Sequence, residues 1–128
     1  MGAGGAEVAV RPPGPLALRA ALVAAGYYLA AHLGFALTPE GSAISMLWPP
    51  NALLLAVLLL APPAQWRLLV GAVLPAHLAV QLQSGVPASM ALPWYFSNCS
   101  EALIGAGAVR LLCGRVPRFD AFRDVGVL

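Results

Sequence analysis

The chain has 128 residues, of which 60% are hydrophobic and only 9% are charged, and its net charge is +2. A soluble domain needs more polar surface than this to cover its own core, so the composition indicates a membrane protein. The length allows one compact unit and leaves no room for an additional soluble enzyme domain of the usual size.

The chain begins with a segment rich in Gly, Ala and Pro, residues 1–15, which we expect to be a disordered cytoplasmic leader. Residues 16–128 then form the integral membrane domain. The first apolar run is of spanning length, unlike the shorter core of a signal peptide, so we expect a retained helix. The predicted fold is all-α, a polytopic transmembrane helix bundle of four spans with a broken second helix. The four apolar runs are residues 16–37, 44–60, 66–82 and 92–113.

The second run is interrupted near its start by Trp48, Pro49, Pro50 and Asn51. Proline lacks a backbone donor and disfavours a helical predecessor, so a helix begins or restarts here. From residue 51 to residue 60 this helix covers about 15 Å, half of a hydrocarbon core, so residues 44–48 either supply the remaining depth in irregular form or dip in from the outer interface. Two interpretations follow: a small polar cavity on the outer side, roofed by Trp48 and lined by Asn51, or a proline kink with an interfacial tryptophan.

The third run contains His77, with Gln81 one turn later on the same helix face. His77 and His32 are both candidates to pair with Glu101 of the fourth run, and each also fits a hydrogen-bonded residue inside the bundle. Their spacing matches no metal-binding motif, so neither a metal nor another cofactor is expected.

The fourth run is the most polar, and helical spacing places Trp94, Asn98, Glu101 and Gly105 on one face. A carboxylate inside a span is costly, so this stripe should face inward with Glu101 protonated, paired or in contact with water. One interpretation is a ligand- or proton-responsive site. The other is an interhelical hydrogen bond that holds the bundle together.

The remaining reactive and aromatic side chains predict structural roles. Cys99 and Cys113 lie about 21 Å apart along one helix, so they cannot pair with each other and are expected to be packing residues. No nucleophile with an adjacent base is recognisable, and enzymatic activity within these residues is not expected. Five aromatic residues are expected to anchor the ends of the spans at the membrane interface: Tyr27, Tyr28, Trp66, Trp94 and Tyr95.

The arginines follow an alternating pattern along the chain. Because basic residues are retained in the cytoplasm, their positions predict that both termini are cytoplasmic and that the spans cross the membrane four times. We expect these arginines to contact anionic lipid and not nucleic acid. Residues 125–128 look like the start of a fifth span, which predicts that the chain is truncated. Arg11 and Arg19 belong to the start of the chain, Arg67 to the second connection, and Arg110, Arg115, Arg118 and Arg123 to the end of the chain.

The chain resembles the first half of the bacterial membrane-associated sensor domain family, first type, over roughly residues 20–128. The resemblance rests on WPPNALLLAVLLLAPPAQWRLLVGAVLPAHL, then YFSNCSEALIGAGAVRLL, then RFDAFRDV. It implies an integral membrane input module at the N-terminus of a bacterial sensor histidine kinase, diguanylate cyclase or related protein, in the plasma membrane. The resemblance assigns the candidate sensory core to Trp48, Pro49, Pro50, Asn51, His77, Asn98 and Glu101.

The predicted function is therefore a sensory input domain that detects an unknown small ligand or a proton. Its expected partners are the lipid bilayer and a cytoplasmic histidine kinase or cyclase output domain. Gly105, Gly107 and Ala108 permit close helix approach within one chain or in a homo-oligomer. The alternatives are a small membrane transporter or substrate-binding membrane subunit that uses the broken helix and Glu101, and a truncated structural fragment.

Overall fold

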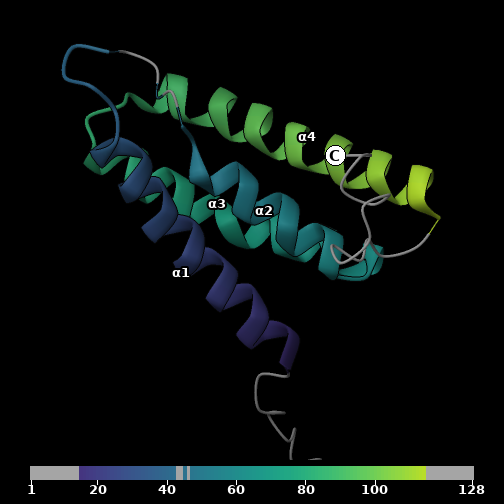
Figure 1. Cartoon of the computed structure of the whole chain (residues 1–128). Coiled ribbons are helices and arrows are strands. Elements are labelled where there is room, and N and C mark those ends of the chain that lie inside the picture. Colours follow the sequence, from purple (N-terminus) through teal and green to yellow (C-terminus); the bar gives the residue numbers. More distant parts are fainter. Residues whose placement is uncertain (1–14, 43–44, 46, 115–128) are drawn as a thin grey trace, which may run out of the picture.

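The structure is a computed structural model that describes residues 15–42, 45 and 47–114. Its elements are all helical: α1 (Pro15–Ala36), α2 (Pro49–Leu60), the short 3-10 helix η1 (Pro63–Gln65), α3 (Trp66–Gln83) and α4 (Ala88–Cys113) (Figure 1). The predicted all-α fold with four principal helices is confirmed. Residues 1–14 of the predicted leader, the charged segment 115–124 and the apolar residues 125–128 lie outside the described residues.

The break before the second helix lies where the prolines predict it. Helix α2 begins at Pro49, and Trp48 is its N-cap in a non-helical conformation. Ser45 and Leu47, which are described within the irregular entry, are also outside any helix. The helix starts here because a proline at its first position gives up only a donor that would have had no partner inside the helix.

The helices form a bundle in which each of the four contacts two neighbours extensively. Helix α1 packs along α2 and α3, and α4 packs against the same two helices from the other side (Figure 1). The cross-section therefore runs α1, α2, α4, α3. The buried core is formed mainly by Tyr27, Leu54, Leu58, Val73 and Cys99, together with small residues of α4.

The surface of the bundle is strongly apolar. Leu22, Leu29, Leu60 and Ile104 are among the large hydrophobic side chains that are more than half exposed. Of the described helices, only α1 is long and apolar enough to cross a membrane by itself, whereas α2 is apolar but shorter. Large apolar side chains on the outside, with the polar residues His77 and Gln81 buried inside, are an arrangement that a lipid environment favours.

One end of the bundle is held by a set of contacts around the last turn of α2. Arg110 of α4 donates from Nη2 to the carbonyl oxygens of Leu59 (3.0 Å) and Ala61 (2.6 Å). Trp66 Nε1 donates to the carbonyl of Leu58 at 2.9 Å, and the Arg110 guanidinium lies 5.5 Å from the centre of the Trp66 ring. The last carbonyls of a helix have no partner within it, so these donors complete α2 and join it to α3 and α4.

Candidate functional site

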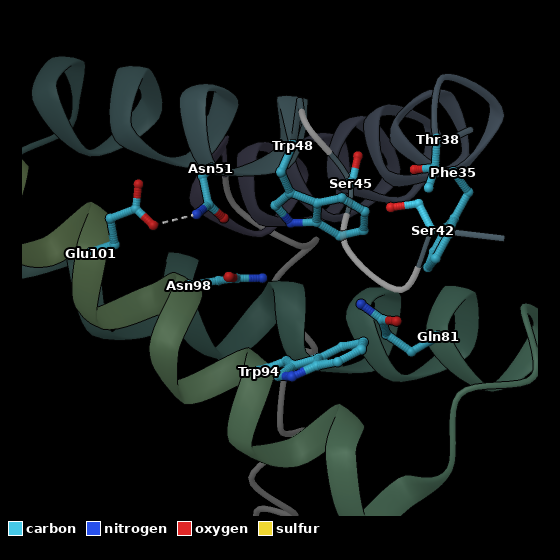
Figure 2. Close-up of a pocket in the computed structure, with 10 residues that line it drawn as sticks. All are labelled: Phe35, Thr38, Ser42, Ser45, Trp48, Asn51, Gln81, Trp94, Asn98 and Glu101. Carbon is cyan, nitrogen blue, oxygen red and sulfur yellow. Dashed lines mark hydrogen bonds between the residues drawn. The ribbon is translucent and has the colours of Figure 1, made fainter. Parts of the chain in front are cut away.

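A cavity of about 410 Å³ lies at the opposite end of the bundle, beside the first turn of α2 (Figure 2). All four principal helices and the segment between α1 and α2 contribute to its wall. Aromatic rings and uncharged polar groups dominate the lining, together with one carboxylate. The lining residues are Phe35, Thr38, Ser42, Ser45, Trp48, Asn51, Gln81, Trp94, Asn98 and Glu101.

Asn51 and Glu101 join α2 to α4 by a hydrogen bond at the edge of this cavity. The Asn51 side-chain nitrogen Nδ2 donates to Glu101 Oε2 at 2.7 Å (Figure 2). Because only the NH₂ group of the amide can donate to a carboxylate, this bond also fixes which way the amide faces. The Asn51 oxygen Oδ1 is buried and has no partner among the described residues. A second cavity of about 280 Å³ includes the same pair in its lining.

The polar stripe predicted on α4 faces α2 and the cavity. Trp94, Asn98 and Glu101 all line the cavity. Gly105 lies against α2, where a Cβ atom at its position would be 3.2 Å from Leu55 Cδ1. These residues therefore share one face, which borders α2 and the cavity, and Glu101 is paired with Asn51. The prediction that this face points inward holds only in part, because Trp94 and Glu101 are exposed and the buried face of α4 is the neighbouring one with Ala91, Tyr95, Cys99 and Ala102.

Trp48 is fixed in place by α1. A Cβ atom on Gly34 would lie 2.9 Å from Trp48 Cε3, so the absence of a side chain at Gly34 is what admits the indole. Phe35 contacts the same indole edge to face at 5.3 Å between ring centres. The Trp48 Nε1 donor is buried without a partner in the described part of the chain. Figure 2 shows Trp48 and Trp94 on opposite sides of the cavity.

Gln81 is the most deeply buried polar residue of the lining. Its side chain is only 2% exposed, and its Oε1 atom has no hydrogen-bond partner within the described residues. Figure 2 shows it entering the cavity from α3, at the end away from Glu101. The sequence placed Gln81 on the same face as His77 but gave it no role in the site.

His77 lies in the core and is held by two hydrogen bonds. Its Nε2 atom lies 2.9 Å from the carbonyl oxygen of Ala91, and its Nδ1 atom lies 3.1 Å from the Tyr27 hydroxyl. A carbonyl only accepts, so Nε2 carries the hydrogen, and in the neutral ring Nδ1 accepts from Tyr27. His77 therefore does not pair with Glu101, and of the two interpretations the hydrogen-bonded residue inside the bundle is the one confirmed for it. His77 is also absent from the cavity lining, and its assignment to the sensory core stays a prediction.

His32 does not meet Glu101 either. Its ring is exposed on α1 and contacts Tyr28 edge to face at 4.5 Å between ring centres. Both histidines predicted as partners of Glu101 are thus engaged elsewhere. The partner that the structure provides is Asn51, which is close to Glu101 only because α2 and α4 are neighbours.

The prediction of interfacial anchors fails for two of the five aromatic residues. Tyr27 is fully buried and Tyr95 is nearly so. The Tyr95 hydroxyl donates to the carbonyl of Val70 at 2.8 Å, which ties α4 to α3. These tyrosines are core residues because their rings fill the space between helices while their hydroxyls find partners there. Cys99 is also buried in the core, as the packing role predicted for it requires.

The site combines features of a small-molecule binding pocket. Its lining brings together aromatic walls, amides and hydroxyl groups, with Glu101 as the one charged member. Within the ranges that the structure describes, no group of three His, Cys, Asp or Glu side chains is arranged to hold a metal ion. The arrangement is suited to binding and orienting a polar ligand between aromatic surfaces.

Comparison with known protein families identifies the family of the chain. The family model for MASE1, the membrane-associated sensor domain of the first type, matches residues 19–128. No curated protein and no solved structure shows significant similarity to the chain. The matched range contains every residue of the cavity lining, and it confirms the resemblance read from the sequence.

Proposed function

The chain belongs to the MASE1 family of membrane sensory domains, and on this premise we propose that it is the input domain of a bacterial signalling protein. Domains of this family are sensory inputs in signalling proteins and are not themselves catalytic. The proposed output is a cytoplasmic domain of the histidine kinase or diguanylate cyclase type. The input domain detects a small ligand or a proton and passes the change to that output domain.

The observation that carries this proposal is the polar cavity bridged by Asn51 and Glu101. The cavity wall is formed by residues of α1, α2, α3 and α4, so a molecule bound there lies among all four helices. Its binding therefore favours whichever packing of the helices fits it better. A ligand shifts an equilibrium between two packings only by the difference in its affinity for them, and a site shared by four helices supplies such a difference.

The proposed setting is the bacterial plasma membrane, with four crossings and both chain ends in the cytoplasm. The described arginines support this orientation because Arg19 and Arg67 lie in the early turns of α1 and α3, and Arg110 lies near the end of α4. The cavity lies at the other end, beside the connection that contains Glu40. With the arginine end in the cytoplasm, the cavity faces the outer side.

The proposed route to the output domain runs along α4. Glu101 lies at the cavity and Arg110 lies nine residues later in the same helix, bonded to the last carbonyls of α2. A change in the contact between Asn51 and Glu101 therefore acts on a helix whose far end is joined to its neighbours. Residues 115–124 follow α4 in the sequence and are the proposed connection to the output domain.

A substitution of Glu101 tests the proposal in the signalling protein that carries this chain. Glu101→Gln keeps the side-chain length and an oxygen that can accept from Asn51, but removes the charge. We expect Glu101→Gln and Glu101→Ala both to change the output activity measured in membranes, either its basal level or its response. The matched control is Glu40→Gln, which neutralises an exposed acid in the connection between α1 and α2 and should leave the output unchanged. Wild-type output from both Glu101 variants would contradict the proposal.

A small transporter or substrate-binding membrane subunit is the second candidate function. The observation that favours it is the position of the cavity at a helix start interrupted by Pro49 and Pro50, beside a carboxylate, as in carriers with broken helices. Uptake of labelled solutes into proteoliposomes containing the chain separates the two functions. Solute accumulation that depends on Glu101 would favour the transporter, and binding without transport would favour the sensor.

A further inference from the structure

We propose that the cavity binds a small organic cation, a protonated primary amine carried on an aromatic or apolar body. The ammonium group lies beside Glu101 and Asn51, and the body lies between Trp48 and Trp94. This inference rests on the proposed sensory function and names the chemical class of its ligand. It follows from three properties of the lining: its charge, its unpartnered polar atoms and its aromatic walls.

The charge of the lining selects a cation. Glu101 is the one charged residue among the ten that form the wall, and no Lys, Arg or His accompanies it. Within the described residues, Glu101 is bonded to the neutral amide of Asn51 and not to a cationic side chain. An anionic ligand would be repelled by the carboxylate, whereas an ammonium group supplies the charge that the site lacks.

The unpartnered atoms select a ligand that donates hydrogen bonds. Asn51 Oδ1 is buried without a partner, and its identity as oxygen is fixed because the nitrogen of the same amide donates to Glu101. An ammonium group has three donors and no acceptor, so it can bond to this oxygen and to the carboxylate together. At the other end of the cavity, the amide of Gln81 is 2% exposed and also has an unpartnered Oε1 atom.

Trp48 Nε1 is the buried donor of the lining that has no partner in the described chain. The Tyr27 hydroxyl is its nearest potential partner within the described chain, without a well-formed hydrogen bond. A hydroxyl group near the amine of the ligand supplies a further acceptor. An amino alcohol thus satisfies both kinds of unpartnered atom. A buried polar atom that loses water and gains no hydrogen bond costs about 1–3 kcal/mol, so a ligand that matches these atoms is favoured over one that does not.

The aromatic walls accommodate the body of such a ligand. Trp48 and Trp94 lie on opposite sides of the cavity (Figure 2), and Phe35 supports Trp48 from α1. Indole rings attract cations and stack on aromatic groups, and the indole of Trp48 lies directly against Gly34 of α1. The cavity volume of about 410 Å³ lies within the usual range for small-molecule sites.

Three ligands of matched shape test the inference by isothermal titration calorimetry on the chain in lipid nanodiscs. Phenylethanolamine, phenylethanediol and mandelate share a phenyl ring and a hydroxyl group, and their remaining group is a cation, a neutral hydroxyl and an anion respectively. We expect saturable binding of phenylethanolamine, binding about tenfold or more weaker for the diol, and none for mandelate. Equal binding of the three, stronger binding of mandelate, or no binding by the folded chain would overturn the inference.

Variants of the chain test which residues bind the amine. Glu101→Gln should weaken phenylethanolamine binding about tenfold or more and leave diol binding unchanged, whereas Glu40→Gln should bind as the wild type does. The Trp94 side chain is 37% exposed, so Trp94→Leu should disturb folding less than a substitution of Trp48 would. It should weaken amine binding about two- to fivefold. Helical circular dichroism establishes that each variant is folded, and unchanged amine affinity in both folded variants would contradict the assignment.

The failure of this inference is distinguishable from the failure of the proposed function. If no amine binds but the output activity still depends on Glu101, the sensory function stands and the ligand class is wrong. If the amine binds through Glu101 but the output is indifferent to that residue, the ligand class stands and the sensory function is wrong.

Discussion

Two polar groups inside the bundle differ in how completely their hydrogen bonds are made. In the first, which we call the core histidine group, His77 bonds through one ring nitrogen to Tyr27 and through the other to the carbonyl of Ala91. In the second, the cavity group formed by Trp48, Asn51 and Gln81, each side chain keeps a buried polar atom without a partner in the described structure.

This difference separates a structural role from a binding role. The core histidine group links α1, α3 and α4, and a substitution there leaves a partner unsatisfied. The cavity group leaves atoms unsatisfied already, and such atoms persist at a cost of about 1–3 kcal/mol each unless water or a ligand completes them. Groups of the first kind hold the helices together, whereas groups of the second kind surround a space that can be filled.

The largest predicted effect comes from removing the imidazole of the core histidine group. His77→Ala removes the acceptor of the Tyr27 hydroxyl and opens a void among three helices. We expect the free energy of unfolding to fall by about 2–4 kcal/mol. Unfolding by SDS in mixed micelles, followed by helical circular dichroism, measures it. The control is His32→Ala on exposed α1 surface, which should change stability by less than about 0.5 kcal/mol. Equal effects of the two variants would contradict the structural role of His77.

A smaller loss is predicted where Trp48 of the cavity group meets α1. Gly34→Ala places a methyl group 2.9 Å from Trp48 Cε3 and should lower the unfolding free energy by about 1–3 kcal/mol. The matched control is Gly71→Ala in α3, where the added Cβ meets nothing within 4 Å. That control should raise stability by about 0.5–1 kcal/mol because glycine is a poor helix former. The same SDS titration measures the unfolding free energy of both variants. If Gly34→Ala were as stable as Gly71→Ala, Trp48 would be free to move.

Replacing the amide of Gln81 tests whether a side chain of the cavity group contributes less to stability than the core histidine group does. Gln81→Met keeps the length and burial of the side chain and removes a polar atom that has no partner in the described chain. We expect the unfolding free energy to change by less than about 1 kcal/mol, or to rise, although Gln81 is buried nearly as deeply as His77. A loss as large as that of His77→Ala would show that Gln81 has a hidden structural partner. Phenylethanolamine titration then reports whether the amide contributes to binding.

The smallest predicted effect on stability belongs to Glu101→Gln. The new amide oxygen still accepts from Asn51, and the residue is exposed toward the cavity side, so the unfolding free energy should change by less than about 0.5 kcal/mol. Unchanged stability together with altered output and weaker amine binding would assign Glu101 to function and not to folding. A large loss of stability would instead make Glu101 a structural residue of the interface between α2 and α4.

The sequence predicted the helices and one face of the site well. Helix α2 begins at Pro49 as the paired prolines require, and the stripe from Trp94 to Gly105 faces α2 and the cavity. These predictions succeed because they depend on one helix at a time. Proline chemistry fixes where a helix can start, and helical spacing fixes which residues share a face.

The predictions that failed depend on where two helices meet. His77 is polar and buried as expected, but its partners are Tyr27 and Ala91, which lie at its own level of the bundle, and not Glu101. Gln81, one turn beyond His77, reaches the level of the cavity instead. Periodicity within a helix cannot give the offset between neighbouring helices along their axes, and that offset decides which polar residues come together.

Besides their packing, helices α2 and α4 are joined by side-chain hydrogen bonds at two places in the described part of the chain. Near the arginine end, Arg110 makes two bonds to backbone carbonyls and contacts the Trp66 ring. At the cavity, a single side-chain bond from Asn51 to Glu101 crosses the interface. The two points are about 14 Å apart along α4. If the bond between Asn51 and Glu101 breaks while the bonds of Arg110 remain, we expect α4 to tilt relative to α2 about Arg110 and not to slide along it. A displacement of less than about 1 Å at the cavity would then become a change in the angle between α2 and α4 at Arg110. Distance probes across the cavity end should therefore register more movement than probes placed at Arg110.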